Sequence, residues 1–263
     1  MDFDLLPGSI RKIVEGLPYS QDRTGMSGSQ VLLFPDLVLK IGPHSVLTDG
    51  MVRVMRWLEG KLPAPRIVQF EKDPKNEYLL MTRIPGKMAC DKAYLEQPDL
   101  LLKLLSEALR MLWEVDAKDC PQNRSLEEEL AHARYSLESG IVDFSRCEPE
   151  TFGPGGFSGP EALLSWLENN KPPLEPAFSH GDCCLPNIFF EGQRVSGFID
   201  LGDAGTADRW RDLSLCYRSL KHNTNGFYGP VVLGFQPERL FDFLGIRPDW
   251  DKLRYYILLD EFF

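Results

Sequence analysis

The sequence of 263 residues contains no long apolar run and no leader-like start. No segment approaches the roughly 18 consecutive apolar residues that a membrane-spanning helix requires. The first residues, from Met1 to Asp4, have neither the basic nor the apolar region of a secretory signal peptide. These absences argue against a membrane protein and against secretion. We therefore expect a cytoplasmic protein that does not bind membranes.

Basic residues are scarce relative to acidic ones. Lys and Arg number 29 against 39 Asp and Glu, so the formal net charge is −10 at pH 7. Nucleic-acid binding depends on basic patches that contact phosphates, so this balance disfavours nucleic acid as a partner. A negative surface also concentrates cationic ligands, but acidity can equally serve solubility alone. Charge by itself leaves both interpretations open.

The cysteines lack any recognisable spacing. None of the six belongs to a Cys-x-x-Cys pair, which argues against a zinc site. Cys183 and Cys184 are adjacent and cannot easily bridge each other. Scattered thiols of this kind are typical of a reducing compartment, in agreement with the expected cytoplasmic location.

The apolar patterning of the chain changes near residue 82. Short strand-like runs with one inserted helix precede this point, and helical segments predominate after it. The expected strands cover residues 30–34, 37–41, 66–70 and 77–82, and the expected helices cover 7–17, 50–61, 98–115, 125–137, 160–168, 212–221, 237–244 and 250–262. Two further runs, 187–190 and 195–199, predict a hairpin. We expect an α+β, bilobal fold with a small β-rich N-lobe at residues 1–82 and a larger, mainly helical C-lobe at residues 83–263.

Two short motifs in the second half of the chain indicate phosphoryl transfer. His180, Asp182 and Asn187 fit the pattern H-x-D-x-x-x-x-N, and Asp200 follows in an Asp-Leu-Gly tripeptide. Protein kinases carry H-R-D-x-x-x-x-N followed by D-F-G. In such a site one carboxylate accepts the proton of the attacking hydroxyl, while an amide oxygen and a second carboxylate hold Mg²⁺ on the phosphates. Either motif alone fits an ordinary turn equally well, but both in order across a hairpin favour the kinase interpretation.

With these motifs, the sequence resembles the aminoglycoside phosphotransferases, and most closely the 3′-phosphotransferases. The pattern H-G-D-x-x-x-x-N at residues 180–187 carries the resemblance, together with the segments 57–63, 197–202 and 255–263. The resemblance implies a two-lobed protein-kinase-like fold and an ATP- and Mg²⁺-dependent enzyme. Its implied activity is phosphorylation of a hydroxyl of an aminoglycoside antibiotic, of the 3′-OH type, which confers resistance. The implied partner is a small cationic aminoglycoside.

The resemblance also implies roles for individual residues. Asp182 is the catalytic base and contacts the acceptor, and Asn187 and Asp200 hold Mg²⁺. Lys40 pairs with the α- and β-phosphates of ATP. The other implied nucleotide contacts are Met26 and Ser27 in the loop over the phosphates, and Met81, Thr82 and Ile84 in the hinge that holds adenine. Val38 replaces an aromatic side chain that stacks on adenine in some relatives, which leaves ATP and GTP both open.

One departure from the family pattern concerns the first-lobe helix. The family carries a glutamate there that orients the phosphate-binding lysine, and Met51 occupies the corresponding position. Two alternatives follow. Either Asp49 takes over this role through a shifted helix start, or Lys40 has no carboxylate partner.

Acidic groups crowd at the C-terminus. Asp260, Glu261 and the terminal carboxylate of Phe263 lie within four residues, and in the 3′-phosphotransferases matching carboxylates bind ammonium groups of the substrate. Negative charge at a helix C-terminus opposes the macrodipole, which favours a functional reason over a merely solvated helix end. Arg218 is a further candidate for substrate binding. Weaker candidates, and positions that differ from some relatives, are Asp143, Glu148, Glu150, Asp203, His222 and Asn223.

Two rival functions remain. The first is a metabolic small-molecule kinase of the same fold that acts on choline, homoserine or another sugar. The second is a nucleotide-binding protein with weak activity, for which the absent helix glutamate is the sole support.

Overall fold

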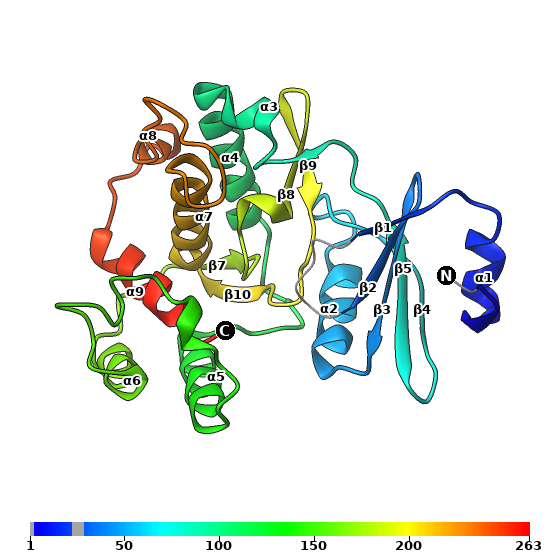
Figure 1. Ribbon diagram of the computed structural model, residues 1–263, viewed down its shortest axis with the longest axis horizontal. Coiled ribbons are helices and arrows are strands. Elements are labelled where there is room, and N and C mark those ends of the chain that lie inside the picture. The colour runs from blue at the N-terminus through cyan, green and yellow to red at the C-terminus, as the bar shows by residue number, and fades with distance from the viewer. Residues whose placement is uncertain (1–2, 23–28) are drawn as a thin grey trace.

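The computed structural model describes residues 3–22 and 29–263, and these form two lobes (Figure 1). One antiparallel sheet with two helices makes the N-lobe, and the other described helices and two small sheets make the C-lobe. The helices are α1 (Gly8–Val14), α2 (Val46–Trp57), α3 (Lys92–Leu95), α4 (Pro98–Trp113), α5 (Leu126–Glu138), α6 (Pro160–Asn169), α7 (Arg209–Thr224), α8 (Arg239–Leu244) and α9 (Trp250–Asp260), with short 3₁₀ turns η1 (Phe3–Leu5), η2 (Phe144–Arg146) and η3 (Leu185–Asn187). No helix in the described ranges is long and apolar enough to span a bilayer. The predicted α+β, bilobal fold is confirmed.

The N-lobe sheet contains the strands that the short apolar runs predict, with one addition. Its strands are β1 (Ser20–Asp22), β2 (Gln30–Leu33), β3 (Leu37–Pro43), β4 (Ile67–Lys72) and β5 (Asn76–Thr82). They follow the order β1-β2-β3-β5-β4, and all neighbours are antiparallel. Strand β1 leaves no signal in the sequence, because its three polar residues carry no apolar pattern and join the sheet by backbone pairing to β2.

The two faces of this sheet separate packing from chemistry. Leu39 and Leu80 pair across β3 and β5 and pack on the α1 side with Ile10. Successive side chains of a strand point to opposite faces. Lys40, which pairs with Leu79, therefore lies on the other face, where Leu79 joins the core that includes α2. The strand period alone thus directs this lysine away from α1.

The C-lobe is built around α4, which the leucine-rich sequence predicts as a buried helix. Leu101, Leu104, Leu105 and Leu109 are fully inaccessible to solvent. Each such side chain contributes about 1.5–3 kcal/mol of burial free energy relative to an exposed one. Helix α4 contacts α7, α8 and a strand of each small sheet, and α7 also contacts α9. This packing gives the loops around the site a rigid base.

Several predicted helices have different bounds. The segment predicted at 50–61 begins at Val46 and ends at Trp57, because the Asp49-Gly50 pair does not interrupt the helix. The one predicted at 7–17 ends at Val14, where Glu15 leaves the helical region with ψ 129°. The one predicted at 212–221 begins at Arg209, because the Asp208 side chain accepts a hydrogen bond from an N–H of the first turn.

Two small sheets hold the loops of the site. The first contains β6 (Lys87–Met88), β8 (Ile188–Glu191) and β9 (Arg194–Phe198), and β8 with β9 is the predicted hairpin. The second pairs β7 (Pro176–Ser179) with β10 (Gly205–Asp208), which the apolar pattern did not reveal. Because Ser179 is the partner of Gly205, the segment before the catalytic motif lies beside the segment after Asp-Leu-Gly.

Candidate active site

A buried carboxylate holds the start of the catalytic loop, residues 180–187. Asp212 of α7 accepts hydrogen bonds from the Ser179 hydroxyl at 2.9 Å, the His180 N–H at 2.8 Å and the Gly181 N–H at 3.0 Å. Burial raises the pKa of Asp212, while His180 and these donors favour its charged form. Asp212 therefore fixes the backbone just before Asp182.

Gly181 allows a close approach between two loops. Its φ is +87°, and a Cβ at this position would lie 2.2 Å from the carbonyl oxygen of Asp203. A left-handed backbone with no room for a side chain requires glycine. The glycine of the His-Gly-Asp motif thus brings the catalytic loop against the loop that follows Asp200.

The side chain of Asn187 is fixed by Asp182. Its Nδ2 donates to Asp182 Oδ2 at 2.8 Å and to the Asp182 carbonyl oxygen at 2.9 Å. The Asp182 N–H donates to His180 Nδ1 at 3.3 Å, and His180 Nε2 donates to the Ile199 carbonyl oxygen at 2.9 Å. His180 therefore links the catalytic loop to the residue before Asp200.

Asp200 lies next to Asn187 in a strained conformation. The Ile199 N–H donates to the Asn187 carbonyl oxygen at 2.9 Å, which brings the two predicted metal ligands together. Asp200 has φ +59°, and it is the one non-glycine residue in the described ranges with positive φ. Such strain costs on the order of 1–3 kcal/mol and is concentrated at functional sites.

Lys40 reaches this group from the other lobe. Its Nζ lies 3.4 Å from Asp200 Oδ1. The predicted phosphate-binding lysine and the predicted metal ligand therefore face each other where the lobes meet. The pair leaves the Lys40 side chain 24% and the Asp200 side chain 53% exposed, so a ligand can reach both.

The structure matches neither of the two alternatives for the helix carboxylate. Met51 is buried in the core. Asp49 lies 2.8 Å from Lys72 of β4 and forms its ion pair there. Asp49 does not replace the missing glutamate, and the carboxylate that contacts Lys40 is Asp200.

The remaining predicted nucleotide contacts fall at the lobe junction. Met81 and Thr82 end β5, and Ile84 is buried just beyond it. The Thr82 N–H donates to the Arg66 carbonyl oxygen at 2.9 Å, and its hydroxyl accepts from the Arg66 N–H at 2.9 Å. Thr82 thus ties the end of β5 to the start of β4 within the N-lobe. Met26 and Ser27 lie outside the described residues.

The C-terminal acids have partners within the chain. Asp260 forms an ion pair with Arg218 of α7. Glu261 Oε1 accepts from the Glu148 N–H at 2.9 Å and from the Thr151 hydroxyl at 2.8 Å. Phe263 is 59% exposed at the chain end. Glu261 therefore anchors the loop of residues 148–157, a contact that the sequence does not reveal.

Comparison with known proteins identifies the family. Residues 23–256 match the sequence model of a protein family described as "Phosphotransferase enzyme family". An aminoglycoside 3′-phosphotransferase of Enterococcus faecalis is 36% identical over 266 residues, 97% of each chain, and one of Staphylococcus aureus is 36% identical over 272 residues, again 97% of each. The chain belongs to the phosphotransferase enzyme family.

Solved structures agree with the assignment of the chain to this family. An aminoglycoside 3′-phosphotransferase of type VIII superposes with a TM-score of 0.79 at 28% identity, covering 97% of both chains. A Streptomyces rimosus aminoglycoside phosphotransferase, also solved with ADP and streptomycin, superposes with a TM-score of 0.81 at 24% identity, covering 96% of this chain and 95% of the other, which shows a common fold.

The donor set of the phosphotransferase fits Mg²⁺. The described residues contain no group of three or more His, Cys, Asp or Glu side chains suited to a metal ion. Asn187 and Asp200 together offer one amide oxygen and one carboxylate. Mg²⁺ prefers oxygen ligands and keeps waters and substrate phosphates in its shell, so few protein ligands suffice.

The sequence does not reveal one contact that positions the loop after Asp200 in the phosphotransferase. Asp203, expected only as a departure from relatives that carry arginine, accepts a hydrogen bond from Arg124 at 2.8 Å. Arg124 also donates to the Gly202 carbonyl oxygen at 3.2 Å. An arginine from the segment before α5 thus steadies the loop after Asp200. Because Arg124 and Asp203 lie far apart along the chain, no local sequence pattern indicates their contact.

Proposed function

We propose that this phosphotransferase is an ATP- and Mg²⁺-dependent aminoglycoside 3′-phosphotransferase that confers resistance to its substrates. Residues 1–82 act as the nucleotide-binding lobe and residues 83–263 as the catalytic and substrate-binding lobe. The observation that carries the proposal is the contact between Lys40 and Asp200 across the lobes, beside the hydrogen-bonded Asp182 and Asn187.

The mechanism assigned to these residues is in-line transfer of the γ-phosphoryl group. Asp182 orients the acceptor hydroxyl and accepts its proton. Lys40 would hold the α- and β-phosphates, and Asn187 and Asp200 would hold Mg²⁺. The metal would neutralise charge that develops on the phosphates. The bond from Asn187 Nδ2 keeps the Asp182 carboxylate in one orientation before the acceptor arrives.

The names of the relatives and the charge of the chain support an aminoglycoside acceptor. The relatives at 36% identity are named aminoglycoside 3′-phosphotransferases. A net charge of −10 favours the approach of a polycation. Asp260, Glu261 and the carboxylate of Phe263 are proposed to bind its ammonium groups, which requires the acceptor to share or displace the internal partners of the first two.

The test is a coupled phosphorylation assay with ATP over kanamycin, neomycin, choline and homoserine, with and without Mg²⁺. We expect turnover of an aminoglycoside that depends on Mg²⁺. Asp182→Ala should lower this turnover by at least about 10²-fold and change ATP binding little, because the residue faces the acceptor. Asp99→Ala, at a 75%-exposed side chain on α4, is the matched control and should behave like the parent.

The internal pairing of Asp260 and Glu261 also favours a second candidate, a metabolic kinase. Both acids could serve only to hold α7 and the loop of residues 148–157. The acceptor would then be a small molecule that does not need these carboxylates for binding. A choline/ethanolamine kinase family protein of Mesorhizobium loti shares the fold with a TM-score of 0.63 at 19% identity. Turnover of choline or homoserine without aminoglycoside turnover would establish this alternative. ATP binding without any turnover would indicate the nucleotide-binding module.

A further inference from the structure

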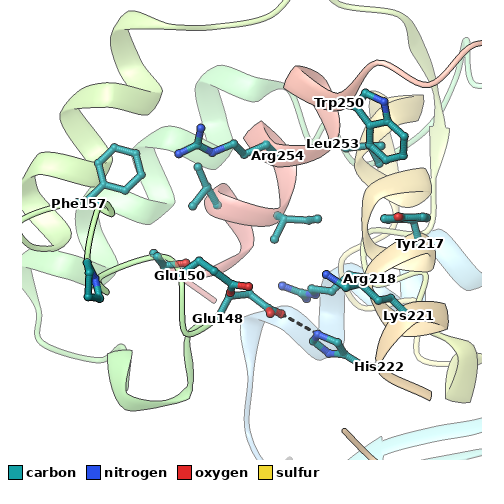
Figure 2. Close-up of a pocket in the computed structure, with 15 residues that line it drawn as sticks. Glu148, Glu150, Phe157, Tyr217, Arg218, Lys221, His222, Trp250, Leu253 and Arg254 are labelled. Carbon is teal, nitrogen blue, oxygen red and sulfur yellow. Dashed lines mark ion pairs between the residues drawn. The ribbon is translucent and has the colours of Figure 1, made fainter. Parts of the chain in front are cut away.

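A cavity of about 490 Å³ opens between α7, α9 and the loop of residues 148–157. Small-molecule sites have volumes of roughly 300–1,000 Å³, so this one can receive a sugar ring. Figure 2 shows Glu148 and Glu150 entering from the loop, and Arg218 and Lys221 from α7 on the other side. The cavity is therefore lined by acids on one wall and by bases on the other.

The cavity adjoins the proposed acceptor site. Arg218 lines the cavity and also pairs with Asp260. Cys184 lies in the catalytic loop between this pair and the catalytic base. Burial, followed by the Asp182 and Asp260 carboxylates, raises the pKa of its thiol. An acceptor whose hydroxyl meets Asp182 can thus extend past Arg218 into the cavity.

Internal contacts already engage some of the charged groups on the cavity walls. Glu148 lies 3.2 Å from His222, and the ring of His222 stacks on Phe227 with centroids 4.4 Å apart. Arg218 is paired with Asp260. On the acidic wall, Glu150 is exposed and faces the cavity without an ion-pair partner among the residues that the structure describes.

Two cations on the opposite wall have no such compensation. Within the described chain, Lys221 of α7 and Arg254 of α9 have no carboxylate within ion-pair distance, and both are exposed. Arg254 instead lies over the ring of Trp166, 5.9 Å from its centroid. On α9, beside Arg254, Trp250, 49% exposed, and the buried Leu253 give an apolar surface. This wall repels ammonium groups and suits the carbon face and hydroxyls of a neutral sugar.

We propose that this cavity receives the part of the acceptor farthest from the reacting hydroxyl, and that Lys221 and Arg254 select against acceptors that carry ammonium groups there. The inference rests on the proposed function and names the acceptors it favours. These are aminoglycosides whose distal ring bears hydroxyls and no amines. Neither residue touches the reacting atoms, so the selection acts through binding and is expected in KM more than in kcat.

Ribostamycin and neomycin test the inference, because they share three rings and neomycin adds a fourth that carries ammonium groups. The parent should have the higher kcat/KM for ribostamycin. The double variant Lys221→Glu, Arg254→Glu should raise the neomycin-to-ribostamycin ratio of kcat/KM about tenfold, equivalent to about 1.4 kcal/mol. Added salt should shrink this change. Calorimetry of both acceptors without ATP should show the same shift in Kd.

The control is Lys12→Glu, an exposed lysine on α1 at the far end of the other lobe. It reverses one positive charge away from the cavity and should leave the ratio unchanged. An unaltered ratio in the double variant, or an equal change in the Lys12 variant, overturns the inference and leaves the proposed function standing. If the parent phosphorylates neither acceptor, the proposed function fails and the inference with it. Equal melting temperatures of parent and variants exclude misfolding as the cause.

Discussion

At the scale of single residues, two backbone conformations shape the catalytic centre. Gly181 and Asp200 both have positive φ, at +87° and +59°. The first brings the catalytic loop within reach of the Asp203 backbone, and the second turns the chain immediately after β9. Surrounding hydrogen bonds sustain both conformations: the Gly181 N–H donates to the Asp212 carboxylate, and the Ile199 N–H donates to the Asn187 carbonyl oxygen.

The substitution Gly181→Ala measures the value of this close approach. A methyl group would lie 2.2 Å from the Asp203 carbonyl oxygen, so the two loops must separate. We expect turnover to fall by at least about tenfold and the melting temperature to drop, since strain and overpacking together cost a few kcal/mol. Gly192→Ala is the matched control, with φ +62° and open space around the added Cβ. Equal losses in the two variants would show that positive φ alone matters.

At the scale of elements, a buried ion pair joins α5 to α7. Glu129 lies 2.8 Å from Arg211 and is only 4% exposed. Burial raises the pKa of Glu129 to about 7, and the attraction of Arg211 and Arg124 offsets this only in part. The pair stands close to the loop that Arg124 steadies.

Glu129 should therefore make stability depend on pH. Between its ordinary pKa of 4.5 and about 7, the folded chain retains a proton that the unfolded chain has lost. The free energy of unfolding should then fall as pH rises through this window, by roughly 3 kcal/mol in total. Glu129→Gln should flatten this decline in urea titrations at a series of pH values. Glu127→Gln, at a 64%-exposed side chain on the same helix, should keep it, and an unchanged slope in both variants would refute the assignment.

The elements also show how much the sequence can predict. Short apolar runs predict β2 to β5, and the leucine pattern predicts α4, because buried elements leave a local trace in the sequence. Strands β7 and β10 leave none, since they form by pairing across a long sequence distance. The motifs place Asp182, Asn187 and Asp200 together, but the internal partners of Asp260 and Glu261 depend on tertiary packing.

At the scale of the whole molecule, one ion pair connects the lobes at the site. Lys40 belongs to the N-lobe sheet and Asp200 to the C-lobe, and they meet at 3.4 Å. Asp49, the acid of α2, forms its ion pair with Lys72 and not with Lys40. Both lobes must therefore keep their relative position for the lysine to stay aligned with the metal ligand.

Two variants separate these contributions. Lys40→Ala should raise the KM for ATP about tenfold or more, because a charge-assisted contact contributes roughly 1.5–3 kcal/mol. Asp49→Asn should leave this KM within about twofold of the parent, since its carboxylate contacts Lys72. Steady-state kinetics over a range of ATP concentrations makes the comparison. A similar rise in both variants would mean that the helix acid does support the lysine.

The buried Met51 has a consequence for control of the enzyme. Protein kinases are switched through a lysine–glutamate pair that is broken when the glutamate-bearing helix swings outward. In this phosphotransferase the acid at Lys40 comes from the metal-binding loop, and Met51 of α2 packs into the core. A partner protein or a phosphorylated segment that displaced α2 would therefore not break the contact between Lys40 and its carboxylate. We therefore expect the rate of the enzyme to depend on the supply of its two substrates and not on a switch at α2.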